Sequence, residues 1–233
     1  GNYMLIALPN MDRSFTCTLF FPFDGEPSFT SLNSNDKIQD FFKTHFTDAA
    51  KLMPTLLHDF IQNPTSSLVT VKCFPWIRNN SFALIGDAAH AIVPFFGQGM
   101  NAGFEDCIVL NDLITKNNEN WSLILPQFEE LRKPDADAIA DLALNNFIEM
   151  RDKVADAQFL LQKKIEGKFS VKHPDKWIPA YSMVTFCPQI RYSEALEKGY
   201  KQQTIMDEIM ALPNIENIWD SIEIENLILS KLS

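Results

Sequence analysis

The chain has 233 residues, 46% of them hydrophobic, and a formal net charge of −10. This length can hold one sizeable core, or one domain and part of another. The acidic balance argues against nucleic acid, whose phosphates need clustered Lys and Arg, and against broad attachment to anionic lipid. The four cysteines are scattered, which argues against a disulfide framework or a zinc site, and no apolar run reaches the roughly 18 residues of a membrane span.

The amino-terminal part of the chain predicts a hairpin followed by a helix. Residues 3–8 and 14–22 are strand-like and flank a Pro-Asn turn signal, so we expect an antiparallel pair with at least one strand near a sheet interior. Apolar residues at helical spacing predict a helix over 36–46, with Ser34 or Asn35 as its N-cap. Because the chain enters an apolar run almost at once, without a Met or a signal peptide, we expect it to be a piece of a longer protein.

The middle of the chain predicts strands and then helices. Residues 69–74 are strand-like, and the apolar run 81–86 ends at a glycine, as expected of a buried parallel strand. The helices expected after this run cover 101–116, about 122–132, Pro134 to Gly167 and roughly 193–210. The expected buried residues of the first of these helices are Ile108, Leu110, Leu113 and Ile114. The acidic, Asn-rich end from Pro213 predicts a mobile tail.

The segment from residue 83 to residue 106 carries the sharpest chemical signal. Asp87 follows the predicted strand, at the edge where α/β sheets place ligands, and its carboxylate can accept hydrogen bonds from ligand hydroxyls. Pro94 stiffens the next loop, while Gly97 and Gly99 let the backbone approach a ligand closely. A helix begins directly afterwards, so its free N–H groups can stabilise negative charge on a planar ring. The alternative is a glycine-rich connection without a ligand, and the glycine spacing does not fit the dinucleotide fingerprint.

The same segment carries a resemblance to a known family. Gly86-Asp87-Ala88-Ala89-His90, then Pro94, then Gly97-Gln98-Gly99-Met100-Asn101 is similar to the second flavin motif of the class A FAD-dependent aromatic hydroxylases, which have the para-hydroxybenzoate hydroxylase fold. The runs 4–10, 92–106, 146–151 and 181–186 resemble the branch of that family that hydroxylates L-kynurenine, and the resemblance covers roughly residues 1–200. It implies that the chain is the carboxy-terminal half of such an enzyme.

The resemblance implies an α/β fold, with an α+β substrate sheet and part of a para-hydroxybenzoate hydroxylase-like FAD fold. The expected divisions are part of a substrate-binding sheet domain at 1–75, the end of the FAD-binding domain at 76–132, a helical carboxy-terminal region at 133–211 and a mobile tail at 212–233. In the family, the amino-terminal dinucleotide motif and the Arg that pairs with the substrate carboxylate belong to the other half. This chain alone is therefore not expected to bind FAD tightly or to catalyse.

The resemblance also implies roles for individual residues. Asp87 would bind the flavin ribityl chain, the backbone at Gly99, Met100 and Asn101 would cap the isoalloxazine ring, and Pro94 and Phe95 would lie between flavin and substrate. Asn146 and Tyr181 would hold the amino-acid end of the substrate. The neighbours expected around the substrate are Glu149 and Met150, on the helical face of Asn146, and Met4, Ile6 and Phe20, which would wall the aromatic ring. Taken singly, Asn146, Glu149 and Tyr181 are more typical of solvated residues and Met150 of core filler, while His90 without a metal-ligand partner indicates a structural role.

The implied activity is the 3-hydroxylation of L-kynurenine with O2, with FAD as cofactor and NADPH as co-substrate, in tryptophan degradation and NAD synthesis. Because the cofactor supplies the chemistry, no side chain is named as catalytic, and no metal is expected. The implied partners are the amino-terminal half of the enzyme and, through the carboxy-terminal region, the cytosolic face of the mitochondrial outer membrane. The alternatives are a class A hydroxylase of another aromatic acid, a flavin halogenase or geranylgeranyl-reductase-like protein, and a non-catalytic fragment.

Overall fold

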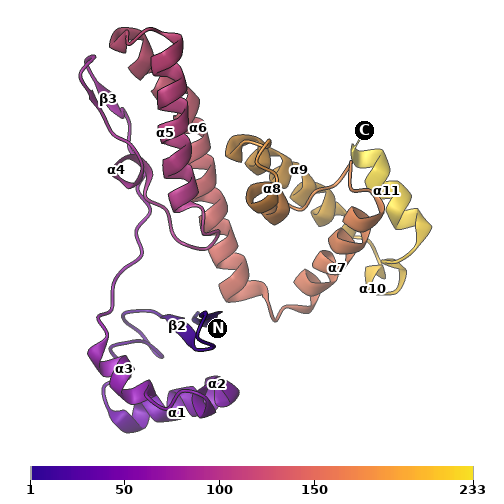
Figure 1. Cartoon of the computed structure of the whole chain (residues 1–233). Coiled ribbons are helices and arrows are strands. Elements are labelled where there is room, and N and C mark those ends of the chain that lie inside the picture. The colour runs from indigo at the N-terminus through magenta and orange to yellow at the C-terminus, as the bar shows by residue number, and fades with distance from the viewer. Residues whose placement is uncertain (1, 233) are drawn as a thin grey trace. The chain divides into compact units, whose positions relative to one another are not determined.

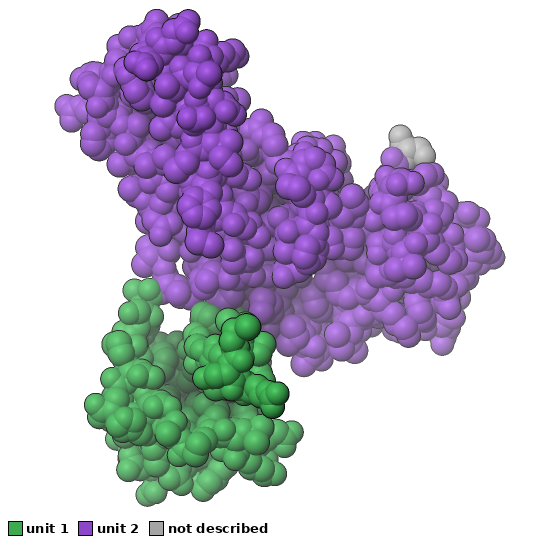
Figure 2. All heavy atoms as spheres, in the orientation of Figure 1, with its two compact units in different colours: residues 1–67 green, residues 68–233 purple. Residues whose placement is uncertain are grey.

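The computed structural model describes residues 2–232, coloured along the chain in Figure 1. The chain divides into two compact units, residues 1–67 and 68–233 (Figure 2). The described part is mixed helix and strand, and mostly helical. None of its helices has both the length and the apolar character that crossing a membrane requires.

The first unit is a hairpin beside three helices. Strands β1 (Met4–Pro9) and β2 (Phe15–Phe20) pair antiparallel, which confirms the predicted hairpin. The sheet has only these two strands in the described part of the chain, and most of β2 is exposed, so the expected interior strand is not found there. Helix α1 (Asn35–His45) begins after Ser34, whose side chain accepts from Lys37 N–H, as predicted. Two short helices follow, α2 (Thr47–Lys51) and α3 (Leu56–Gln62).

Aromatic packing forms the core of this first unit. The buried residues are Leu32, Ile38, Phe41 and Phe42. Tyr3 lies edge-on to Phe21 and Phe41, with ring centroids 5.7 and 5.2 Å apart, in the geometry that aromatic pairs prefer. Contacts between aromatic rings thus join the hairpin to α1 in this unit.

The second unit begins with little strand structure. Residues 69–74 form no strand, although Val71 N–H donates to Ala91 C=O. Strands β3 (Ile77–Arg78) and β4 (Phe82–Ala83) make a two-residue antiparallel pair. The prediction of a buried parallel strand at 81–86 is therefore wrong: β4 has no parallel neighbour among the described residues, and Phe82 is 56% exposed. An apolar run indicates that its side chains are buried, but it does not show which part of the chain covers them.

Three helices position the segment from 83 to 106. They are α4 (Asp87–His90), α5 (Gly99–Lys116) and α6 (Trp121–Ile148), and α5 runs alongside α6 (Figure 1). The predicted helix at 101–116 is confirmed. Leu113 is buried, and Leu110 and Ile114 pack against the same core, but the expected burial of Ile108 is wrong because it is 60% exposed. That core contains Trp76, Ala89, Leu113, Ile124, Phe128 and Ala136.

Helix α6 is continuous across a position where the sequence predicts a break between two helices. Pro134 was expected to start a new helix but lies inside α6. A proline costs a helix interior about 3 kcal/mol. Arg132, Asp135 and Ala136 around it are all buried, so tertiary packing outweighs this local cost.

The chain breaks later, after Ile148, at a single π-helical turn, Glu149–Lys153. Helix α7 (Ala157–Lys172) then starts with Asp156 as N-cap, and Gly167, expected at a helix end, lies inside it. The predicted long helix from Pro134 to Gly167 is thus two helices with different boundaries.

The carboxy-terminal helices form a second apolar core. They are α8 (Ala180–Phe186), α9 (Tyr192–Met210), α10 (Ile215–Ile218) and α11 (Ile222–Leu232), and α9 confirms the helix predicted near 193–210. The segment expected to be a mobile tail is instead helical over most of its described residues. Ile215 of α10 is buried in a core with residues of α7 and α9, and so are Ile224 and Ile228, which lie four residues apart on one face of α11.

Candidate functional site

The connection from β4 to α5 has the backbone geometry of a ligand loop. Gly86 and Gly97 have positive φ values of 59° and 66°, a conformation that side chains with a Cβ rarely adopt. Gly86 turns the chain into the short helix α4, which leaves the Asp87 side chain exposed, and Pro94 is exposed farther along. The predicted flavin residues Asp87 and Pro94 are therefore accessible to a ligand.

The amino-terminal end of α5 offers unpaired backbone donors. Gln98 occupies the N-cap position but makes no side-chain cap hydrogen bond. Its Oε1 instead accepts from Asn101 Nδ2 at 2.8 Å and from Tyr192 Oη at 3.0 Å. The first N–H groups of this 18-residue helix, at Gly99, Met100 and Asn101, are left for a ligand, and the helix dipole favours negative charge there. This donor set fits the electron-rich edge of a planar cofactor such as a flavin.

A buried ionic cluster fixes the loop to α5 and α6. Asp106 is fully buried, and its Oδ2 accepts from Gly86 N–H at 2.9 Å and from His90 Nε2 at 2.6 Å. Its Oδ1 accepts from Arg132 Nε at 2.7 Å. Arg132 also donates to Ala102 C=O at 3.2 Å. We call His90, Asp106 and Arg132 the loop clamp, since together they tie both ends of α4 to α5 and α6.

The clamp holds Asp106 ionised. Burial alone would raise the pKa of this carboxyl, but the hydrogen bonds from His90, Arg132 and Gly86 outweigh burial, so the pKa lies below its ordinary value. An ionised carboxylate only accepts, so His90 Nε2 carries the proton in this hydrogen bond. The structural role expected for His90 stays a prediction, and in this position the side chain joins α4 to α5. The described residues contain no group of His, Cys, Asp and Glu side chains that could hold a metal ion.

A second set of contacts continues the clamp to α9. Asp135 accepts from Arg132 at 3.4 Å, from Arg191 Nε at 2.9 Å and from Ser193 Oγ at 2.7 Å. Burial, together with Glu105, raises the pKa of Tyr192 to about 12, so its hydroxyl stays protonated and donates to Gln98. The start of α9 is thereby held against the N-cap of α5.

Asn146 of α6 contacts the loop directly. Its Nδ2 donates to Phe95 C=O at 2.6 Å and lies 3.5 Å from Met150 Sδ. The Phe95 ring, buried in the structure, stacks on Phe147 with centroids 4.5 Å apart. Three predicted substrate residues, Phe95, Asn146 and Met150, are therefore neighbours, and Asn146 also has a role in positioning the loop.

Three of the predicted substrate residues of this unit line a large open cavity. It has a volume of about 790 Å³ and lies among α6, α7, α8 and α9. Asn146, Glu149 and Tyr181 line it, and the Tyr181 ring stacks on Phe96 at a centroid distance of 5.4 Å. Lys163 lies 3.7 Å from Glu149 and 3.2 Å from Glu166 at its wall. The cavity is large enough for an aromatic amino acid and offers both charges and hydrogen-bonding groups to it.

The remaining predicted substrate residues lie in the first unit. Met4 and Ile6 are two residues apart on β1, and Phe20 is the direct partner of Met4 on β2. These three half-buried side chains therefore share one face of the hairpin, as residues of a common wall should.

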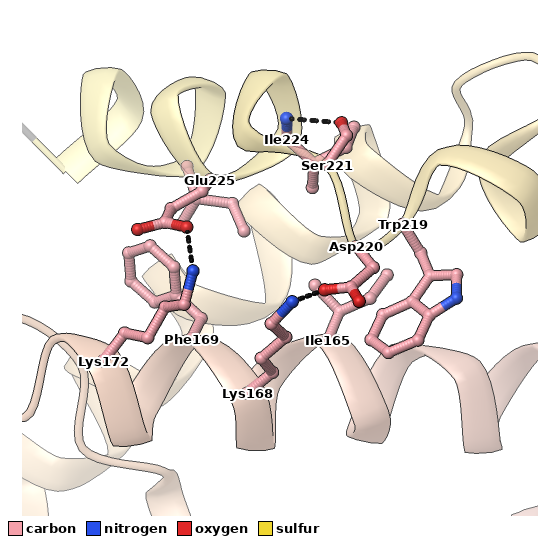
Figure 3. Close-up of a pocket in the computed structure, with 10 residues that line it drawn as sticks. Ile165, Lys168, Phe169, Lys172, Trp219, Asp220, Ser221, Ile224 and Glu225 are labelled. Atoms are coloured by element: carbon pink, nitrogen blue, oxygen red, sulfur yellow. Dashed lines mark hydrogen bonds and ion pairs between the residues drawn. The ribbon is translucent and has the colours of Figure 1, made fainter.

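A hollow between α7 and α11 has a different character (Figure 3). Its volume is about 20 Å³, room for little more than one water. Lys172 pairs with Glu225 and Lys168 with Asp220 across it. None of the predicted site residues lines this hollow, which is a seam between packed helices.

Sequence reasoning did not name the residues that hold the site in place. Asp106 stood in the quoted motif without a role, and Arg132, Gln98 and Tyr192 were not singled out. A buried arginine so far along the chain from the loop has no local pattern, because its partner is set by the packing of α5 on α6. Asp106 offered one signal, an acidic residue seven positions into a helix that is otherwise mostly apolar on its buried side.

Comparison with known proteins shows, first, a match to a protein-family model. A family model described as an FAD binding domain matches residues 50–143, which include the loop and the clamp. This part of the chain is therefore similar to FAD binding domains.

Closer relatives define the family. The chain is 59% identical to kynurenine 3-monooxygenase of Flavobacterium johnsoniae over 232 residues, all of this chain and 52% of that protein. It is 48% identical to the Dictyostelium discoideum enzyme of the same name, over 90% of this chain and 48% of that protein, and 45% identical to the Sus scrofa enzyme, over 88% and 43%. The chain belongs to the kynurenine 3-monooxygenase family, and it spans about half the length of the curated relatives it matches.

Proposed function

We propose that the chain is the carboxy-terminal half of a flavoprotein monooxygenase that converts L-kynurenine to 3-hydroxykynurenine, using FAD, NADPH and O2. The observation that carries the proposal is the arrangement of the complete flavin motif around the uncapped end of α5, next to a cavity lined by Asn146, Glu149 and Tyr181. The names of the relatives and the FAD-binding family model support it. The para-hydroxybenzoate hydroxylase-like fold belongs to the same proposal.

In this proposal, the loop holds the cofactor. Bound FAD would supply the redox chemistry, with NADPH as the source of electrons and O2 as the source of the added oxygen. Asp87 would accept hydrogen bonds from ribityl hydroxyls. The N–H groups at Gly99, Met100 and Asn101 would stabilise negative charge on the ring. Pro94 would separate the flavin from the substrate.

The substrate residues would orient the kynurenine ring. Tyr181 and Asn146 would bind its amino-acid end by hydrogen bonds, and Glu149 would lie close to the ammonium group. Phe95 and Met150 would pack against the apolar ring and exclude water. The role of Met4, Ile6 and Phe20 of the hairpin as a wall for the ring is a separate part of the proposal, which the resemblance alone supports. No side chain acts as a nucleophile in this scheme.

The test uses a full-length enzyme that contains both halves. NADPH oxidation is measured with L-kynurenine and with a panel of other aromatic acids. We expect L-kynurenine to stimulate oxidation most. Equal or greater stimulation by another aromatic acid would favour the second candidate, a class A hydroxylase with a different substrate, and no stimulation by any of them would contradict both.

A matched pair of variants tests the substrate assignment. Tyr181→Phe keeps the stacking on Phe96 and removes only the hydroxyl, so it should raise the KM for L-kynurenine by roughly tenfold, with kcat little changed, if one hydrogen bond to a charged group is lost. Tyr200→Phe changes a tyrosine of the same cavity that has no predicted role, and should leave the KM unchanged. The same effect in both variants would remove the specific role of Tyr181.

Location stays a prediction. The resemblance implies attachment to the mitochondrial outer membrane through the carboxy-terminal region, whereas the relatives come from bacteria as well as from a mammal and an amoeba. We infer that the location follows the organism, with the hydroxylase chemistry common to all of them.

A further inference from the structure

One wall of the large cavity carries a lysine between two carboxylates. Lys163 Nζ of α7 lies 3.2 Å from Glu166 Oε2 on the same helix and 3.7 Å from Glu149 Oε2 on the π-helical turn. All three residues line the cavity. The second distance is longer than a hydrogen bond, so Lys163 is bonded to Glu166, whereas its contact with Glu149 is looser.

Hydrogen bonds between two helices fix Glu166 and therefore Lys163. The Glu166 side chain is 12% exposed, and its Oε1 accepts from Gln162 Nε2 at 2.6 Å. Gln162 Nε2 also donates to Gln203 Oε1 of α9 at 3.0 Å, and Gln203 Nε2 donates to Asp207 Oδ1 at 2.7 Å. Because each member of this network has a partner, Glu166 is held in one place on the wall and holds Lys163 beside it.

The ammonium group of Lys163 is open to a ligand in the cavity. The Lys163 side chain is 40% exposed, although its Nζ lies 5.2 Å from the centre of the Phe159 ring. An ammonium group has three N–H donors, and the hydrogen bond to Glu166 uses one of them. The Glu149 side chain is 33% exposed, so a cation and an anion 3.7 Å apart are both accessible.

We propose that Lys163 and Glu149 together bind the zwitterionic head of an α-amino acid, with Lys163 taking the carboxylate and Glu149 the ammonium group. The two charged groups of such a head are attached to one carbon atom, so they fit a cation and an anion that lie side by side. Charges would then alternate from Glu166 through Lys163 and the two groups of the ligand to Glu149. Each charge would have a neighbour of opposite sign, which offsets its removal from water.

The inference deepens the proposed function and rests on it for the identity of the ligand. L-Kynurenine is an α-amino acid, and Asn146 and Tyr181 of the same cavity are proposed to bind the same end of it. The carboxylate would thus have a cation within this chain, in addition to the Arg that the resemblance implies for the other half. The pair of Lys163 and Glu149 would select aromatic α-amino acids over aromatic amines and over aromatic acids without an amino group.

Three ligands that differ only in the charged head test this assignment. They are L-kynurenine, its desamino analogue, which keeps the carboxylate, and its decarboxylated analogue kynuramine, which keeps the ammonium group. Dissociation constants are measured by titration calorimetry with the full-length, FAD-loaded enzyme in the absence of NADPH. The wild-type enzyme should bind L-kynurenine at least about tenfold more tightly than either analogue, because each analogue leaves one charged group of the site without a partner.

Variants of the two residues should change this selectivity in opposite ways. Lys163→Met should weaken the binding of L-kynurenine and of the desamino analogue by about tenfold and leave kynuramine unchanged, because only the first two have a carboxylate. Glu149→Gln should weaken L-kynurenine and kynuramine and leave the desamino analogue unchanged. Lys163→Arg keeps the charge and should retain most of the affinity. An equal loss for all three ligands in Lys163→Met would show a structural role and would overturn the proposal.

A second lysine of the cavity provides the matched control. Lys153 lines the same cavity and lies 5.8 Å from the centre of the Phe159 ring, but in the described part of the chain no hydrogen bond or ion pair holds its ammonium group. Lys153→Met removes the same charge and should change the three dissociation constants by less than about twofold. A loss as large as that in Lys163→Met would assign the effect to the general charge of the cavity and would also overturn the proposal.

The binding assay separates failure of this inference from failure of the proposed function. If L-kynurenine binds with the expected selectivity but does not stimulate NADPH oxidation, the proposed function fails and the assigned pair stands. If L-kynurenine stimulates oxidation and Lys163→Met leaves all three dissociation constants unchanged, only the inference fails. A wild-type enzyme that does not bind L-kynurenine would contradict both. If Lys163→Met does not fold, Lys163→Gln takes its place, with the same expected selectivity and the same contradicting result.

Discussion

The candidate flavin loop and the carboxy-terminal helices are held together by different forces. Around the loop, the fully buried Asp106 joins the backbone of Gly86 to His90 and Arg132, so ionic hydrogen bonds fix the geometry. In the cluster of α7, α9, α10 and α11, isoleucines and aromatic rings form the core, and charged pairs such as Lys172 with Glu225 lie at its surface. The first region has directional contacts and the second mostly non-directional ones.

This difference indicates where precision is needed. Hydrogen bonds to a buried carboxylate fix a loop in one conformation, because any other arrangement leaves a charge unpaired. Apolar packing stabilises a helix cluster but tolerates substitutions that keep its volume. The loop clamp therefore suits a cofactor site, and the carboxy-terminal cluster suits a supporting wall for the cavity.

The largest effect should come from removing the clamp carboxylate. Asp106→Ala leaves Arg132 buried without its main partner, which should lower the free energy of unfolding by about 3–5 kcal/mol. Thermal or denaturant unfolding of the full-length enzyme measures this change. Asp137→Ala removes a partly exposed partner of Lys133 and should cost less than about 1 kcal/mol. Comparable losses in the two variants would mean that the clamp is an ordinary surface-type interaction.

A cavity in the carboxy-terminal core gives the corresponding test of the other region. Ile228 is 1% exposed, and Ile228→Ala should cost about 2–5 kcal/mol through lost burial and the cavity left behind. Ile222→Ala, on the same helix but 58% exposed, should cost far less. Hydrogen exchange should show loosening of α11 while α5 stays protected. Loosening of both helices would show that the two regions unfold as one.

Acid should weaken the loop clamp. The pKa of Asp106 is lowered in the folded state, so its contribution to stability is complete above its ordinary pKa, near 3.8, and is lost as the pH falls through the lowered value. We expect the melting temperature to fall below about pH 4 and the fall to be smaller in Asp106→Asn. The pKa of Glu225 is lowered by Lys172 and His173, but this carboxylate is outside the core, so Glu225→Gln should change the profile less. Identical profiles in the two variants would contradict the assignment of the acid response to the clamp.

The sequence predicted best those features that depend on residues close together in the chain. The hairpin, α1 with its Ser34 cap, α5 and α9 each follow from spacing and capping residues that lie side by side in the chain. The candidate flavin loop could be picked out for the same reason, since its aspartate, proline and glycines lie within one short run, and its role in flavin binding stays a prediction. Of the site residues, Asn146, Glu149 and Tyr181 were chosen from the resemblance and do line one cavity.

The sequence failed where distant packing decides the structure. Pro134 has the local preference of a helix start, yet buried neighbours keep α6 continuous through it. The acidic composition after Pro213 suggested a mobile tail, although Ile215, Ile224 and Ile228 pack on α7 and α9. The run at 81–86 suggested a buried parallel strand, whereas β4 pairs antiparallel with β3 over two residues, because an apolar run does not specify its partner strand. Arg132 could not be found at all, because its role depends on the packing of α6 against α5.

The most direct test of the central claim is the flavin content of the full-length enzyme with Asp87→Ala, measured by the visible absorbance of the purified protein. Losing the hydrogen bonds of one carboxylate should reduce the affinity for FAD by about tenfold or more, while Asp175→Ala, which removes an exposed carboxylate far along the chain, should retain the wild-type content. A fall in Asp87→Ala alone would support the loop from Gly86 to Asn101 as the flavin site. Undiminished flavin in Asp87→Ala would contradict it.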